Sequence, residues 1–468
     1  GRLLTQPFAA TTPGGKQSPR WTTHRGHQSR ECRMKITFAQ INFRIGDFEH
    51  NVTRILEVIQ SDNETNEPSD LIVFSELALT GYYPQDLLLD SRFQQREAEA
   101  LDQVREATRG RDVAVLIGHT GASGDPFRPR QNQLSVLRDG ECIFSYVKRK
   151  LPTYGVFEER RHFAPGGRAP VVFEHAGQRI GVLICEDGWT DAEPNNPGDP
   201  VPALIAEQPD LVVHINASPG EVGKLRDREG RFRELAEQVG CPWLYVNQVG
   251  GHDELVYDGG SCIHDPTIGQ TDTLGLPVYQ EAIGQWLTTG AGEERFRIVR
   301  GEGVAPPIGS VDDNQILYNH LVRGLRDYAG KCGFERVVVG CSGGIDSAVT
   351  LALAVAALGA DNVTAITMPS RYSSAGSVHD SEQLCQALGV TMIEAPIEKE
   401  FSEALRTYEQ DIGAPAAPGA LPASASAVVR PRLWPSSCSD KCRALEESGR
   451  GRPSHIPLPG LLPRVQPL

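Results

Sequence analysis

The chain has no apolar run that approaches the ~20 residues a helix needs to cross a lipid bilayer. Its longest apolar stretch, at 349–358, has the length of an ordinary helix. Positive charge is also scarce, because 46 Lys and Arg residues face 60 Asp and Glu residues and give a formal net charge of −14. Nucleic acid and anionic membrane surfaces are therefore not expected as partners.

Clustered cysteines are missing as well. The 10 cysteines are scattered singly, unlike the dense spacing of small secreted disulfide-linked domains. The close pair Cys438 and Cys442 has no second pair that would complete a zinc site. This usage favours a cytoplasmic enzyme with free thiols. The chain of 468 residues is long enough for two or three domains, each with its own core.

The two ends of the chain differ in composition from its middle. The first segment is rich in Arg, Ser, Thr and Pro, which indicates a disordered leader before a natural start at Met34, or alternatively an organellar targeting segment. The last segment is rich in proline and has no helical or strand period, which predicts a disordered tail. The expected organisation is a leader (1–33), a first domain (34–300), a linker (301–312), a second domain (313–410) and a tail (411–468).

In the first domain, short runs rich in β-branched residues alternate with amphipathic segments. This alternation predicts a mixed sheet with helices, in an α/β arrangement. A hairpin is expected over 134–148, turning at Asp139-Gly140. Other strands are expected at 34–41, 71–74, 113–118, 179–184, 211–215 and 243–247, and helices at 48–60, 92–108 and 222–239.

The second domain follows the order helix, strand, loop, helix, strand, helix, strand. This order predicts a doubly wound parallel sheet. The expected strands cover 336–339, 363–367 and 390–393, and the expected helices cover 314–332, the segment after Ser347, and 377–388.

Cys185 directly follows the apolar run 179–184 and opens the sequence Cys-Glu-Asp-Gly. A thiol at a strand end can be presented to a substrate by the turn, although a buried small hydrophobic residue is the commoner interpretation. Attack on an amide also needs a base, and a nearby cation favours the thiolate. Glu76 and Lys148 follow other expected strands, but each alone could be a helix cap or a solvated strand end. Lys150 shares one side of an alternating strand with Lys148, so the pattern does not choose between these lysines.

A second candidate site is the loop Ser-Gly-Gly-Ile-Asp-Ser at 342–347, between an expected strand and an expected helix. Glycines let backbone N–H groups approach phosphate oxygens, and a helix N-terminus favours negative charge. The loop lacks the Gly-Lys-Ser/Thr ending of a Walker A motif. It is therefore a candidate phosphate-binding loop of another type.

Both segments resemble known families. Glu76, Lys148 and Cys185, in this order and each after a strand, resemble the Glu-Lys-Cys triad of the nitrilase superfamily. The loop at 342–347 resembles the pyrophosphatase loop of N-type ATP pyrophosphatases, and Met-Pro-Ser-Arg-Tyr-Ser-Ser at 368–374 resembles the corresponding loop of NAD synthetases. The resemblance to glutamine-dependent NAD synthetases implies an α/β protein with a nitrilase-like α-β-β-α sandwich, followed by an incomplete, doubly wound ATP pyrophosphatase domain.

The resemblance also implies roles for particular residues. Cys185 would be the nucleophile, Glu76 the general base and Lys148 the group that stabilises the oxyanion. Lys148 is preferred to Lys150 because the family places its lysine three residues before Leu-Pro. Glutamine would be bound by Tyr154, Ser218 and Lys224, with Glu159 and Glu186 near the triad; ATP would be bound by Gly340, Cys341, Ser342, Gly343, Gly344, Ile345, Asp346 and Ser347, with Asp346 also holding Mg²⁺.

The implied reaction is the ATP-dependent amidation of deamido-NAD with ammonia from glutamine, and a homo-oligomer is expected for the full-length family form. The Glu-Asn-x-Gln-Ala-Arg and Thr-Gly-Asn-Lys-Ser-Glu stretches of the family are not found after Tyr408. We therefore expect an impaired synthetase half and an apolar sheet face left uncovered. A free-standing nitrilase-type amidase and a non-catalytic nucleotide-binding regulatory subunit remain as alternatives.

Overall fold

The computed structural model describes residues 33–125, 127–168, 170–189, 198–266, 274–289, 295–301 and 312–412. The expected leader up to residue 32, the tail from 413 onward with its two cysteines, and linker residues 302–311 lie outside the described residues. The chain divides into two compact units, of which the larger comprises Gly1–Met368 with Ser373–Ala395 and the smaller comprises Pro369–Tyr372 with Pro396–Leu468.

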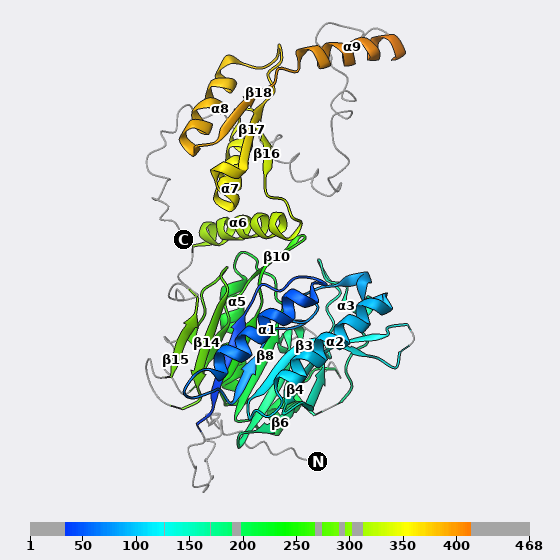
Figure 1. The fold of residues 1–468 in the computed structure, drawn as a ribbon, viewed down its shortest axis with the longest axis vertical. Helices are drawn as coiled ribbons and strands as arrows, with labels where there is room; N and C mark the ends of the chain where they lie inside the picture. The colour runs from blue at the N-terminus through cyan, green and yellow to red at the C-terminus, as the bar shows by residue number, and fades with distance from the viewer. Residues whose placement is uncertain are drawn as a thin grey trace, which may run out of the picture. The chain divides into compact units, whose positions relative to one another are not determined.

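Two sheets form most of the larger unit (Figure 1). In the described residues the first has seven strands in the order β15-β14-β1-β2-β3-β4-β5, and the second has six in the order β13-β12-β9-β8-β7-β6. The first contains β1 (Lys35–Gln40), β2 (Leu71–Val73), β3 (Ala114–Ala122), β4 (Arg130–Arg138), β5 (Glu141–Val147), β14 (Ala282–Leu287) and β15 (Phe296–Arg300). The second contains β6 (Val172–His175), β7 (Gln178–Ile184), β8 (Leu211–Asn216), β9 (Trp243–Asn247), β12 (Cys262–His264) and β13 (Leu274–Gly275).

Strand alternation distributes the side chains of the first sheet between two cores. Leu71 and Val73 of β2 belong to the core shared with the second sheet, whereas Ile72 packs in the core beneath the outer helices. Helices α1 (Phe48–Asn63) and α2 (Ser91–Ala107) cover this outer face, as Figure 1 shows. On the second sheet, α5 (Lys224–Val239) packs on β9, and α4 (Val201–Glu207) contacts α5. The result is the expected α-β-β-α sandwich.

Local signals explain where several elements begin and turn. Asp47 caps α1 by accepting a hydrogen bond from His50 N, and Asp90 caps α2 by accepting one from Arg92 N. The hairpin between β4 and β5 turns at Asp139-Gly140, where both residues have positive φ (49° and 76°). This confirms the expected hairpin, because a tight two-residue turn of this kind requires positive φ at both central positions.

The residues expected to form the second domain contain a three-stranded parallel sheet in the order β16-β17-β18 within the described residues. Ser374 caps α8 by accepting a hydrogen bond from Ser377 N. Side chains on this sheet are partly exposed, with Val338 65% and Ile393 48% accessible. The elements are α6 (Asp313–Lys331), β16 (Val337–Gly340), α7 (Ile345–Leu358), β17 (Val363–Thr367), α8 (Ala375–Leu388) and β18 (Thr391–Glu394).

Several elements were not expected from the sequence. The helix α9 (Glu398–Ile412) continues past Tyr408, where no period was recognised. The short strands were also missed, because segments of two to four residues are too brief to show an alternating pattern. They include β10 (Val249–His252) and β11 (Leu255–Asp258), which form a hairpin that contacts α6. The other short elements that were not expected are α3 (Glu159–His162) and the 3₁₀ turns Gln85–Leu89, Cys185–Gly188 and Ala360–Asn362. None of the helices in the described part of the chain has the length and apolar character of a membrane span.

Candidate active site and nucleotide loop

Three strand ends bring the candidate triad together. Glu76 lies three residues after β2, Lys148 directly after β5, and Cys185 directly after β7. The Glu76 and Lys148 side chains are fully buried and Cys185 is 7% exposed. All three therefore lie inside the sandwich, shielded from bulk water.

Lys148 is the centre of a buried charge cluster. Its Nζ atom lies 2.7 Å from Glu76 Oε1 and 2.8 Å from Glu159 Oε1. Glu76 is further fixed by Asn132 Nδ2, which donates to Oε1 at 2.7 Å, and by Ala217 N, which donates to Oε2 at 2.8 Å. The carboxylate and the lysine are thus held in one geometry before any substrate binds.

The structure distinguishes the two lysines that the sequence pattern could not separate. Lys150 Nζ donates to the Trp189 carbonyl and lies 3.2 Å from Asp199 Oδ1, whereas Lys148 contacts the two glutamates. The choice of Lys148 agrees with this geometry, because only Lys148 contacts Glu76.

Cys185 adopts a strained backbone conformation, with φ of 42° at the first residue of the turn Cys185–Gly188. The imidazole of His214 supports this turn, since its Nε2 atom lies 2.9 Å from the Cys185 carbonyl oxygen. Burial lowers the His214 pKa to about 3, so the ring is neutral and Nε2–H donates this bond. A Cβ atom at Gly188 would lie 2.5 Å from His214 Cε1, so the turn needs glycine there.

Burial dominates the electrostatics of the thiol. Burial and the Glu76 charge raise the Cys185 pKa well above its ordinary value, although Lys148 acts in the opposite direction. Burial lowers the Lys148 pKa, but Glu159 and Glu76 outweigh it and the net pKa is raised. Burial also raises the pKa of Glu159. The resting thiol is therefore protonated, which differs from the expectation that a neighbouring cation would favour the thiolate.

Sequence reasoning missed Asp187, a fully buried carboxylate two residues after Cys185. Its Oδ1 atom accepts from Arg149 N at 3.0 Å and Lys150 N at 2.9 Å. Its Oδ2 atom accepts from Tyr146 OH at 2.9 Å and Ile184 N at 3.3 Å. Asp187 thus ties the cysteine turn to the strand end that carries Lys148, and its place in Cys-Glu-Asp-Gly was the signal available in the sequence.

The expected glutamine-binding residues differ in their burial. Tyr154 is 58% exposed, and its hydroxyl donates to Glu186 Oε2 at 2.9 Å. Ser218 is buried, and its N–H donates to Asn247 Oδ1 at 2.9 Å. Burial and Arg228 lower the pKa of Lys224, while the Cys185 charge raises it, so this lysine lies within electrostatic range of the thiol.

The candidate phosphate loop joins β16 to α7, as expected. The Ser347 hydroxyl accepts from Ser342 N at 3.2 Å and donates to Gly344 O at 2.9 Å, which closes the loop on itself. Gly343 has φ of 78°, and a Cβ atom there would lie 2.4 Å from Ser377 O. Ile345 is 75% exposed at the first turn of α7. The first turn of α7 is thus exposed to solvent, and a helix N-terminus of this kind favours a bound anion.

Comparisons with known proteins match both parts of the chain. The carbon-nitrogen hydrolase family matches residues 35–270, and the NAD synthase family matches residues 317–425. A glutamine-dependent NAD(+) synthetase of Xanthomonas campestris is 38% identical over 377 residues, which cover 79% of this chain and 63% of that protein. The Thermotoga maritima protein of the same name is 35% identical over 403 residues, which cover 81% of this chain and 67% of that protein.

A solved structure gives the same result. The glutamine-dependent NAD+ synthetase from Acinetobacter baumannii, in complex with adenosine diphosphate, superposes with a TM-score of 0.71 at 33% identity. The match covers 82% of this chain and 69% of that one. These matches confirm the expected fold class.

The α-β-β-α sandwich with its buried Glu, Lys and Cys side chains defines a carbon-nitrogen hydrolase domain. With the parallel sheet and loop that follow, the chain belongs to the family of glutamine-dependent NAD(+) synthetases. It spans 63% of the Xanthomonas protein and 67% of the Thermotoga protein.

Proposed function

We propose that this chain hydrolyses glutamine at Cys185 and uses the ammonia to amidate deamido-NAD in an ATP-dependent reaction at the loop 342–347. The observation that carries the first half is the Lys148 ammonium, ion-paired to Glu76 and Glu159 in the same buried site as the thiol. The second half is supported by the loop between β16 and α7, which contains two glycines and leads into a helix N-terminus.

The glutaminase mechanism follows from the protonated state of the thiol. Because the Cys185 pKa is raised, proton transfer to Glu76 accompanies the attack of Sγ on the amide carbon of glutamine. Lys148 stabilises the oxyanion of the tetrahedral intermediate. Glu76 then gives its proton to the departing ammonia and afterwards activates water against the thioester.

Other buried groups would position these three. Glu159 accepts from Tyr82 OH at 2.7 Å and is the second carboxylate that contacts Lys148 Nζ. Tyr154, Ser218 and Lys224 would bind the glutamine, with the Tyr154 hydroxyl oriented by Glu186. Positioning of this kind supplies a large share of enzymatic rate enhancement.

In the second domain, N–H groups and hydroxyls at the end of β16 and in the loop would hold ATP phosphates. The residues proposed to bind ATP are Gly340, Cys341, Ser342, Gly343, Gly344, Ile345, Asp346 and Ser347. The described residues contain no group of three or more His, Cys, Asp or Glu side chains that could hold a metal ion. A single carboxylate on the loop would be enough for Mg²⁺, because this ion keeps several waters and binds through one or two carboxylates and substrate phosphates. Asp346 would supply the carboxylate.

The cellular compartment and the oligomeric state are the last parts of the proposal. The described cysteines, Cys142, Cys185, Cys241, Cys262, Cys332, Cys341 and Cys385, are all free thiols, which supports a reducing compartment such as the cytoplasm. A homo-oligomer of the full-length form and an impaired synthetase half in this chain both remain predictions.

The experiment is a pair of assays on the wild type, Cys185→Ala and the matched control Cys241→Ala. Glutamate release from glutamine should be lost in Cys185→Ala and retained in Cys241→Ala, whose thiol is also buried but lies two residues before β9. NAD formation from deamido-NAD, ATP, Mg²⁺ and ammonium tests the second half without the thiol. Glutamate release from Cys185→Ala would contradict the glutaminase assignment. Slow but detectable NAD formation from ammonium is the expected result for the second half. No NAD at all would contradict the proposed amidation, and NAD formation as fast as glutamate release would contradict the predicted impairment.

A further inference from the structure

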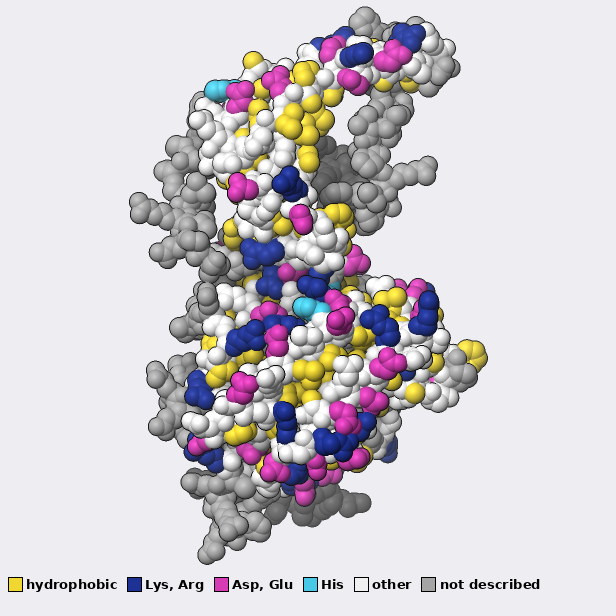
Figure 2. All heavy atoms as spheres, viewed as in Figure 1, with side chains coloured by type: hydrophobic (Ala, Val, Ile, Leu, Met, Phe, Trp, Pro, Cys, Tyr) yellow, Lys and Arg dark blue, Asp and Glu magenta, His cyan; other side chains and the backbone are white. Residues whose placement is uncertain are grey.

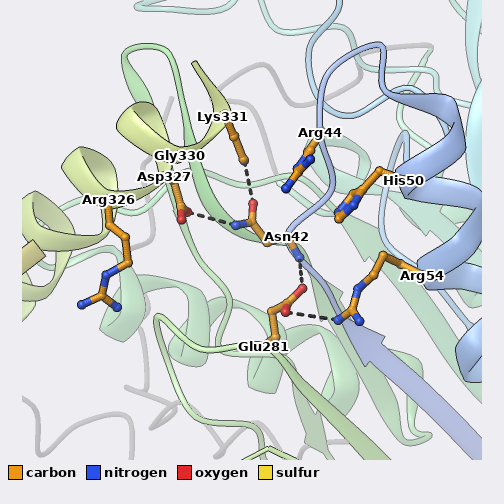
Figure 3. Close-up of a pocket in the computed structure, with 9 residues that line it drawn as sticks. All are labelled: Asn42, Arg44, His50, Arg54, Glu281, Arg326, Asp327, Gly330 and Lys331. Carbon is orange, nitrogen blue, oxygen red and sulfur yellow. Dashed lines mark hydrogen bonds and ion pairs between the residues drawn. The ribbon is translucent and has the colours of Figure 1, made fainter. Parts of the chain in front are cut away.

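A polar pocket lies apart from the thiol and the phosphate loop, between α6 and the segment from the end of β1 into α1. Its volume is about 470 Å³. Figure 3 shows Arg44, His50 and Arg54 on one wall and residues of α6, including Lys331, on the facing wall. Figure 2 shows Lys, Arg and His side chains on this face, with acidic side chains among them. The lining residues are Asn42, Arg44, His50, Arg54, Glu281, Arg326, Asp327, Gly330 and Lys331.

Cations outnumber carboxylates in this lining. Three arginines and one lysine face two carboxylates, Glu281 and Asp327. Glu281 is already occupied, since it accepts from Asn42 N at 2.9 Å and from Arg54 Nη2 at 3.1 Å. It therefore neutralises Arg54 and leaves the other cations uncompensated.

The second carboxylate is also committed to neighbouring groups. Asp327 Oδ2 accepts from Arg323 Nε at 2.6 Å, from Gly251 N at 2.7 Å and from Asn42 Nδ2 at 3.1 Å. Arg323 does not line the pocket. The charge of Asp327 is thus used mainly outside the lining, and the net positive charge of the pocket remains.

The remaining cations have weak or neutral partners. Arg44 makes one ion pair, a 3.4 Å contact with the exposed Asp47. Lys331 Nζ donates only to neutral groups, at 2.6 Å to Asn42 Oδ1 and 2.8 Å to Gly251 O, and it has no carboxylate partner within the described residues. The His50 ring forms no hydrogen bond in the part of the chain that the structure describes, although it faces the hollow in Figure 3.

The titration behaviour of two lining groups is consistent with a positive field. Burial, followed by Arg44, lowers the pKa of His50. Burial also lowers the pKa of Lys331 to about 7; Asp327 acts against this shift, while Arg323 and Arg44 add to it. An anion placed among these groups would relieve their mutual repulsion.

We propose that this pocket binds a small phosphate-bearing anion, inorganic phosphate or diphosphate, through Arg44 and His50, with Lys331 supplying further positive charge. A guanidinium offers paired N–H donors that match phosphate oxygens. The lining has no Phe, Tyr, Trp or large aliphatic side chain on which a nucleobase could pack. The chemistry therefore favours the inorganic anion over a nucleotide.

The test is isothermal titration of the full chain with sodium phosphate and, separately, sodium diphosphate at constant ionic strength. Arg44→Gln and His50→Gln should each weaken the binding, with a loss of about tenfold or more for Arg44→Gln. Arg138→Gln is the matched control, because Arg138 is similarly exposed (42% against 47%) and also makes a 3.4 Å ion pair, with Asp112. Thermal unfolding of each variant establishes that it folds.

Each outcome decides the proposal. Weaker anion binding by Arg44→Gln together with unchanged affinity of Arg138→Gln supports the proposed site. The anion that binds more tightly to the wild type is then identified as the ligand. Equal binding by wild type and Arg44→Gln, or an equal loss in Arg138→Gln, overturns it. Complete loss in Ser347→Ala alone would place all binding at the loop and also overturns it. None of these measurements depends on glutamine turnover, so the result is independent of the proposed function.

Discussion

Replacement of Asp187 tests whether the cysteine turn depends on its tie to the Lys148 strand end. Asp187→Ala would remove the acceptor of the N–H groups of Arg149, Lys150 and Ile184 and of the hydroxyl of Tyr146. An unpaired buried donor costs about 1–3 kcal/mol. The four donors together, with some relaxation, give an expected loss of about 4 kcal/mol in the free energy of unfolding.

Asp187→Asn should lower the free energy of unfolding much less than Asp187→Ala does at neutral pH, because the wild-type carboxylate is already destabilised by the burial of its charge. Burial raises the Asp187 pKa from 3.8 to about 6. A shift of about 2 units corresponds to roughly 3 kcal/mol against the ionised form. Since the folded pKa is raised, this carboxyl lowers stability as pH rises from about 4 to about 6. The deficit of Asp187→Asn should therefore be larger by about 1 kcal/mol at pH 5 than at pH 7.5.

The assay combines denaturant unfolding with glutaminase kinetics. We expect kcat/KM for glutamine to fall about tenfold or more in Asp187→Ala and less in Asp187→Asn, because displacement of a nucleophile by about 1 Å is costly. Asp62→Ala is the matched control. Asp62 is also a buried carboxylate that accepts from a backbone N–H, Ser69 N at 2.7 Å, but it lies on α1 and does not contact the cysteine turn. It should lose stability and keep its kcat/KM.

Two results would refute this reasoning. One is wild-type kcat/KM in a folded Asp187→Ala chain, which would mean that the turn holds its shape without the carboxylate. The other is an equal loss of kcat/KM in Asp62→Ala, which would mean that any loss of stability disturbs the site. If Asp187→Ala does not fold, Asp187→Asn provides the same comparison through its pH dependence.

Three further predictions concern the two sites. Lys148→Ala should lower the rate of glutamate release about 10²-fold or more, since it removes oxyanion stabilisation; a smaller loss would assign that role to another group. The pKa of Glu159 is raised, so this carboxyl ionises above the ordinary pH range of a glutamate and its ion pair with Lys148 strengthens there. Wild-type kcat/KM should therefore rise with pH across that range, and Glu159→Gln should remove this rise. Gly343→Ala should weaken ATP binding in calorimetry, because its Cβ would lie 2.4 Å from Ser377 O, whereas Gly359→Ala, which also has positive φ but no atom within 4 Å of its Cβ, should bind ATP normally.

The sequence by itself determined the features that are written locally along the chain. An apolar run that ends in Cys-Glu-Asp-Gly placed Cys185 at a strand end, and the run at 342–347 placed the phosphate loop between a strand and a helix. The hairpin at Asp139-Gly140 was predictable because two adjacent residues set the turn. Strand and helix periods of this length need no information from distant residues.

Only the tertiary structure decided which groups meet and how they ionise. Lys148 and Lys150 are equivalent in the pattern, and the sheet pairing brings Lys148, but not Lys150, to Glu76, a residue 72 positions away. The role of Asp187 as a tie is likewise visible only once β5 and β7 lie in facing sheets. The raised pKa of Cys185 arises from desolvation by side chains drawn from the whole sandwich, and burial is a property of packing that no local stretch of sequence encodes.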